Sequence, residues 1–105
     1  MIPREVKKQM ERELRQYYEN KNILEKIKKN NSESTRRLLY LETRILYVEN
    51  VLKRLNPFEK EVFHLIYKDG ADCVYCQTIK NISKSTYYNI INKCIRFLAE
   101  EWGII

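Results

Sequence analysis

A seven-residue repeat of apolar side chains constrains the fold of this chain more than any other feature. Its members keep heptad a and d spacing over about two and a half heptads, and they are Leu38, Leu41, Ile45, Val48, Leu52 and Leu55. This spacing places all of them on one face of a helix. It predicts a helix from about Glu33 to Leu55 that buries this face.

Two structures could cover the leucine-rich face, and the repeat alone leaves both open. In a homodimer, a coiled-coil seam would be formed with a second copy by Leu38, Leu41, Ile45, Val48 and Leu52. In a hairpin, the preceding segment would cover the same side chains. From Arg4 to about Lys29 that segment has helical apolar spacing, with Val6, Met10, Leu14, Tyr17, Leu24 and Ile27 on one face. We expect an antiparallel helical hairpin over residues 1–55, with the polar residues 30–34 at its tip.

Composition supports an all-α fold and a polyanionic partner. The chain has 105 residues with only two Gly and two Pro, which favours long helices. Lys and Arg number 20 against 14 Asp and Glu, and the whole excess lies in residues 1–56. A basic arm lying on DNA is therefore the alternative use of the first helix. Neither a membrane-spanning apolar run nor a signal peptide is visible, so we expect a cytoplasmic protein.

A second helical region is predicted to begin at the run Asn56-Pro57-Phe58-Glu59. Asn56 can cap a helix, Pro57 suits its first turn, and Glu59 can complete a capping box. This helix should extend to about Lys68 and end at Asp69-Gly70, where Gly supplies a left-handed C-cap. We place a boundary here, with the hairpin in residues 1–55 and a second domain in residues 56–105.

Two further helices are predicted between Asp72 and Leu98. Asp72 can cap a short helix over 73–80, with Cys73, Cys76 and Ile79 facing inward. Asn81 tolerates the left-handed backbone that a tight turn requires, and Ser83 can cap the long helix that follows. The pattern is typical of a helix-turn-helix, although an ordinary helical hairpin would share it.

The polar face of the long helix is the candidate site for double-stranded DNA. Short polar and cationic groups at a helix start suit base edges, and the candidates are Lys84, Ser85, Thr86, Tyr88 and Asn89. Candidates for phosphate contacts are Lys80, Ser83, Lys93 and Arg96. Thr86 is also placed to take part in the helix cap.

Catalysis and metal binding are disfavoured by the pattern. Cys73, Cys76, Cys94 and His64 could form a Cys₃His zinc site, but the three cysteines fall on predicted inward faces, where a thiol packs as a small hydrophobe. No nucleophile elbow or Gly-rich phosphate loop is present. We expect a non-enzyme without a cofactor.

Three stretches together resemble region 4 of bacterial sigma factors and, more closely, small phage-encoded transcription regulators of the RinA/ArpU type. They are Leu52 to Phe63, Tyr67 to Gly70 and Ile82 to Tyr88, so the resemblance covers roughly residues 52–98. The family pattern has a small residue in place of Gln77 and Gly in place of Asn81. The resemblance implies a sigma-like helix-turn-helix that binds promoters of phage or prophage genes in the bacterial host cell, with RNA polymerase as a further partner.

Two other functions remain as alternatives. A small terminase-like DNA-packaging subunit would also join a helix-turn-helix to oligomerising helices. A sigma-like protein-interaction module would dock on another protein without reading DNA, and the zero net charge of residues 57–105 is compatible with it.

Overall fold

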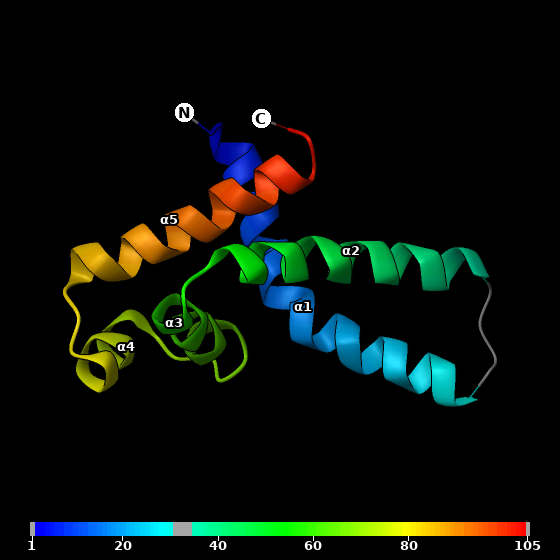
Figure 1. The fold of residues 1–105 in the computed structure, drawn as a ribbon, viewed down its shortest axis with the longest axis horizontal. Coiled ribbons are helices and arrows are strands. Elements are labelled where there is room, and N and C mark those ends of the chain that lie inside the picture. Colours follow the sequence, from blue (N-terminus) through cyan, green and yellow to red (C-terminus); the bar gives the residue numbers. More distant parts are fainter. Residues whose placement is uncertain (1, 31–34, 105) are drawn as a thin grey trace.

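The computed structural model describes residues 2–30 and 35–104, and all its regular secondary structure there is α-helical. The helices are α1 (Arg4–Asn30), α2 (Thr35–Arg54), α3 (Pro57–Tyr67), α4 (Cys73–Lys80) and α5 (Lys84–Glu101), as shown in Figure 1. The all-α prediction is confirmed, and the helix ends lie within three residues of their predicted positions. Most of the predicted polar break at 30–34 lies outside the described residues.

The start of α3 follows directly from its sequence. The backbone N–H of Glu59 donates to the side chain of Asn56 at 2.8 Å, and the N–H of Asn56 donates back to the Glu59 carboxylate at 3.0 Å. This reciprocal capping box satisfies two backbone donors that the helix leaves free. At the other end Gly70 has φ +71°, the left-handed conformation that favours Gly.

Helices α1 and α2 run in roughly opposite directions and contact each other, and in Figure 1 α1 passes behind α2. The carboxylate of Glu13, which is 4% exposed, pairs with the guanidinium of Arg44 on α2. Near the C-terminal end of α1, the ammonium of Lys28 lies 3.5 Å from the carboxylate of Glu42 on α2. The two helices are therefore joined by polar contacts as well as by apolar packing.

The leucine-rich face of α2 is covered within the single chain. Leu41, Ile45 and Val48 are buried and Leu38 and Leu52 are half-buried, because α1 and α5 lie against α2. Burial of these side chains within one chain favours the hairpin over an intermolecular seam. A heptad repeat specifies that a face is buried but not which helix buries it.

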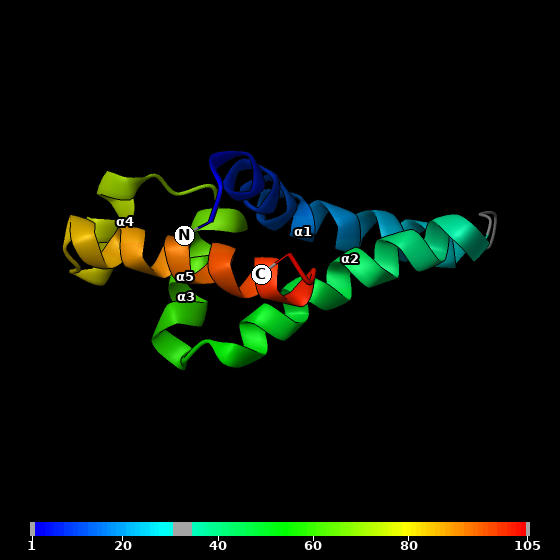
Figure 2. The same ribbon diagram turned by 90° about the horizontal axis from the view of Figure 1, so that it is seen from above.

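One hydrophobic core crosses the predicted boundary at residues 55 and 56. It contains buried side chains from all five helices, among them Leu14, Val51, Phe63, Cys76 and Leu98. Helix α5 packs against each of the other four helices and runs from one end of the molecule to its middle in Figure 2. The regions 1–55 and 56–105 thus share their core instead of packing as separate units.

Candidate nucleic-acid interface

Helices α4 and α5 are joined by a tight turn whose geometry agrees with its sequence. The backbone N–H of Tyr75 donates to the Asp72 carboxylate at 2.8 Å and caps the start of α4. Asn81 has φ 53° and ψ 49°, and its N–H donates to the carbonyl of Gln77. Ser83 then caps α5, since its hydroxyl accepts from the Thr86 N–H at 3.1 Å. Both helix starts and the turn are therefore fixed by local hydrogen bonds.

The inward face of α4 differs from the prediction at Ile79. Cys76 is fully buried and Cys73 is half-buried as expected, but Ile79 is 52% exposed. Lys80 occupies the inner side instead, where its ammonium lies 3.1 Å from the carboxylate of Glu61 on α3. A helix of only two turns has a narrow buried face, and here that face is turned toward Lys80.

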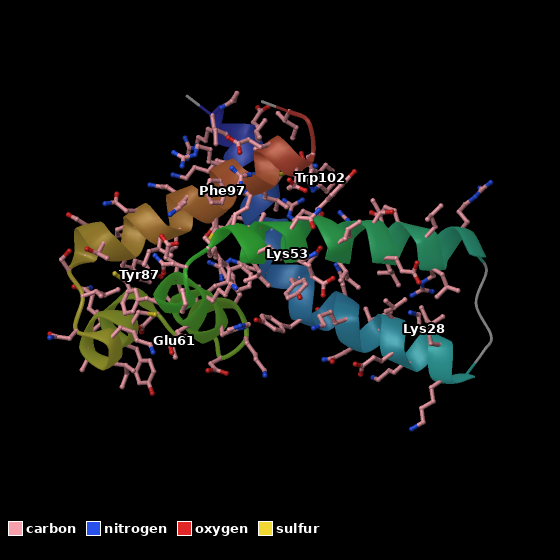
Figure 3. All side chains as sticks on the ribbon, viewed as in Figure 1. Lys28, Lys53, Glu61, Tyr87, Phe97 and Trp102 are labelled. Carbon is pink, nitrogen blue, oxygen red and sulfur yellow. The ribbon has the colours of Figure 1, made fainter. Side chains whose placement is uncertain are left out.

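Helix α5 is divided lengthwise into a buried face and an exposed polar stripe. The buried side chains are Tyr87, Ile90, Cys94, Ile95, Phe97, Leu98 and Ala99. Figure 3 places Tyr87 on the side of α5 that faces α3 and α4. The polar stripe, as we call it, consists of the exposed residues Lys84, Ser85, Tyr88, Asn89, Asn92 and Arg96. The core thus holds one face of α5 and leaves the polar stripe to solvent.

Four of the five predicted base-contacting residues lie on the polar stripe. Lys84, Ser85, Tyr88 and Asn89 are all exposed in the first two turns of α5. Thr86 is half-buried, and its hydroxyl accepts a hydrogen bond from Ser83 at 3.0 Å. Thr86 therefore belongs to the helix cap, as its position had suggested.

The predicted phosphate-contacting residues fall into two groups. Arg96 is exposed and takes part in no ion pair with a described residue, whereas Lys93 is 2.8 Å from the Glu59 carboxylate and Lys80 pairs with Glu61. Ser83 is exposed, but its hydroxyl is engaged in capping α5. Paired lysines must leave their carboxylates before they can bind a phosphate, so their contribution to binding is reduced.

Glu59 links α3 to α5 and accounts for the pairing of Lys93. Burial raises the pKa of Glu59, but hydrogen bonds from Lys93 and from the Asn56 backbone outweigh it, so its pKa lies below the ordinary value. The carboxylate is therefore ionised at neutral pH. Sequence reasoning missed this pair, because 34 residues separate its members.

The start of α1 also lies beside the polar stripe, which the sequence analysis did not predict. A hollow of about 300 Å³ lies between Lys7, Glu11 and Arg15 of α1 and a row of α5 residues that includes Tyr88 and Asn92. The only signal available in the sequence was the basic character of residues 1–56, which leaves its spatial neighbour undetermined.

The cysteines and the histidine do not form a common cluster. Cys76 and Cys94 are buried, and burial raises the pKa of the Cys94 thiol to about 12. His64 is exposed and shares a hydrogen bond with the Tyr18 hydroxyl on α1. Among the described residues, no three His, Cys, Asp or Glu side chains gather closely enough to hold a metal ion.

A separate apolar surface lies on the outer side of α2. Leu39 and Tyr40 are 63% and 56% exposed, and with Tyr47 and Trp102 they line a groove of about 420 Å³. The ring centroids of Tyr47 and Trp102 are 5.7 Å apart, so the residue that follows α5 packs on α2. Figure 3 shows Trp102 beside α2. This groove shares no residue with the polar stripe.

Comparisons with known proteins leave the family open. No protein-family model, curated protein or solved structure matches the chain. Within residues 2–30 and 35–104, none of the helices combines the length and the apolar character needed to cross a membrane.

Proposed function

We propose that the protein is a sequence-specific, double-stranded DNA-binding regulator of transcription that inserts the start of α5 into a major groove. The observation that carries this proposal is the polar stripe, which is exposed on a helix whose other face is locked into the core. In Figure 1 the first turns of α5 lie at one end of the molecule, so the other helices leave them accessible. Together with the Asn81 turn and α4, the exposed stripe supports the proposal of a helix-turn-helix.

The side chains of the stripe match the chemistry of base edges. A major groove about 12 Å wide admits one helix with its side chains. Asn89 can bind an adenine through two hydrogen bonds, and Lys84 can donate to the acceptors of a guanine. The ring of Tyr88, which is 44% exposed, can contact a thymine methyl group. Ser85 can donate to or accept from either strand.

The biological setting of this proposal rests on the resemblance over residues 52–98. On that basis the regulated genes are those of a phage or prophage, the protein acts in the cytoplasm of the bacterial host, and RNA polymerase is a further partner. None of these assignments changes the DNA-binding test below.

The direct test is selection of bound duplexes from a random pool at about physiological salt, where pure phosphate attraction is weakened. We expect one motif to be enriched. The double variant Lys84→Ala/Asn89→Ala should lose most of the preference for that motif, since each good base contact contributes about 1–3 kcal/mol of discrimination. The matched control Lys26→Ala/Asn22→Ala changes exposed residues of α1 that lie away from α5. A Lys84/Asn89 variant that still selects the same motif would refute the assignment.

A second candidate function is supported by the apolar groove on α2. Exposed Leu39 and Tyr40 beside Trp102 suit a protein partner, as in a sigma-like interaction module that does not read DNA. Absence of any enriched motif would favour this function. A ring-shaped assembly, measured by light scattering, would instead favour the terminase-like packaging subunit.

A further inference from the structure

The first turns of α1 and the polar stripe of α5 border the same space. Asn92 lines both the hollow that contains Lys7 and a second hollow of about 570 Å³ that contains Ile2 and Arg96. Figures 1 and 2 both show the start of α1 beside α5. A ligand that follows the stripe toward Arg96 therefore meets the N-terminal end of the chain.

The cations at this end of α1 are available for an anionic ligand. Arg4 and Lys7 are exposed, lie one turn apart on the helix, and take part in no ion pair with any described residue. Arg15, farther along the same hollow, is paired with Glu11 at 3.0 Å. On α5, Lys93 is likewise paired, with Glu59. Among the described residues, Lys7 and Arg96 thus supply positive charge without an ion-pair partner to the two hollows that Asn92 lines, and Arg4 lies one turn before Lys7 on α1.

We propose that the first two turns of α1 form a second DNA-binding element, in which Arg4 and Lys7 bind the phosphates that flank the base contacts of α5. Asn92 lies about 7 Å along the helix from the middle of the first two turns of α5, and Arg96 about 13 Å. A helix that enters the groove by its N-terminal turns passes the sugar–phosphate backbone at about this distance, because the groove is about 12 Å wide. Arg4 and Lys7, which form no ion pair with a described residue, supply positive charge at this distance, whereas Lys80 and Lys93 are paired with carboxylates.

This inference rests on the proposed function, and the test separates the two. Binding to the selected duplex is measured from about 50 to 200 mM salt for the wild type and for Arg4→Gln/Lys7→Gln. The matched control Lys26→Gln/Lys29→Gln removes two exposed lysines with the same spacing from the far end of α1. The charge-keeping variant Arg4→Lys/Lys7→Arg tests whether charge alone is required, and circular dichroism checks that every variant is folded.

We expect the Arg4/Lys7 variant to lower the slope of log K against log salt by roughly 2, since each phosphate contact contributes about 0.9. Its preference for the selected motif over random duplex should stay unchanged, because phosphate contacts carry no sequence information. The control and the charge-keeping variant should retain the wild-type slope. Two outcomes would overturn this inference and leave the proposed function standing. In the first, all proteins show the same slope. In the second, the slope falls equally in the Arg4/Lys7 variant and in the control. A wild type that binds no duplex would overturn the proposed function as well.

Discussion

The contact between Glu13 and Arg44 gives a quantitative test of how α1 is held to α2. The carboxylate of Glu13 is 4% exposed, while the side chain of Arg44 is 23% exposed and lies over the Tyr40 ring at 4.6 Å. The Nε atom of Arg44 is buried without a hydrogen-bond partner, so the pair is only partly satisfied. Two single substitutions, Arg44→Met and Glu13→Leu, should therefore have unequal effects on the free energy of unfolding.

The two single substitutions differ in effect because each leaves a different charged group without its partner. Arg44→Met leaves a carboxylate with almost no access to water, and removing one partner of a buried pair costs about 3–5 kcal/mol. Glu13→Leu leaves a guanidinium that can reach solvent, so we expect a loss of about 1–2 kcal/mol. The double variant leaves no charge and fills the space with apolar atoms, so its stability should return to within about 1 kcal/mol of the wild type.

Urea unfolding, followed by far-UV circular dichroism, measures all four proteins of this double-mutant cycle. If the double variant is as stable as the wild type, the predicted coupling between the two sites equals the sum of the single losses, about 4–7 kcal/mol. Unchanged m-values would show that the variants expose similar surface on unfolding and can be compared directly. The reasoning is refuted if the two single losses simply add in the double variant, or if Glu13→Leu is the more destabilising change.

Two further predictions concern His64 and Asn81. Although His64 is exposed overall, partial desolvation of its imidazole, followed by the charge of Lys68, holds its pKa below the ordinary value. The unfolded chain therefore binds a proton at this histidine at a higher pH than the folded chain does, and the free energy of unfolding falls as pH is lowered from about 7 to 5. Urea midpoints across this range should vary less in His64→Gln. Because Asn81 has φ 53°, Asn81→Ala should cost about 1–2 kcal/mol of stability while Asn81→Gly costs little or nothing, and equal urea midpoints for the two variants would contradict this account of the turn.

The helices were predictable because their ends are determined by neighbouring residues. The capping box of Asn56 and Glu59, the cap at Ser83 and the left-handed turn at Asn81 all use side chains within a few positions of the backbone they fix. Such short-range hydrogen bonds can be inferred from spacing alone. The exposed half of the candidate site was predictable for the same reason, since Lys84, Ser85, Tyr88 and Asn89 follow from helix periodicity.

The parts that the sequence did not predict all depend on contacts between distant segments. The pairing of Lys80 with Glu61 spans 19 residues, and the position of Lys7 beside Asn92 joins the first helix to the last. Periodicity identifies the face of a helix that is buried, but it carries no information about the partner. The same limit applies to the leucine-rich face of α2, because a hairpin and a dimer would both produce the same heptad repeat.

The sequence at Leu55 and Asn56 predicts the start of a helix correctly, but it does not show whether a domain boundary lies there. A cap followed by Pro57 marks the start of α3 correctly, and it also resembles a boundary between domains. Yet Leu55 is only 4% exposed and belongs to the core that α1, α2, α3 and α5 share. Because the apolar face of the second half of α5 is buried in this common core, the polar stripe and the cations of α1 are held in a fixed relation to each other. The proposed DNA-binding surface, which combines the start of α5 with the start of α1, would therefore need no rearrangement of these helices on binding.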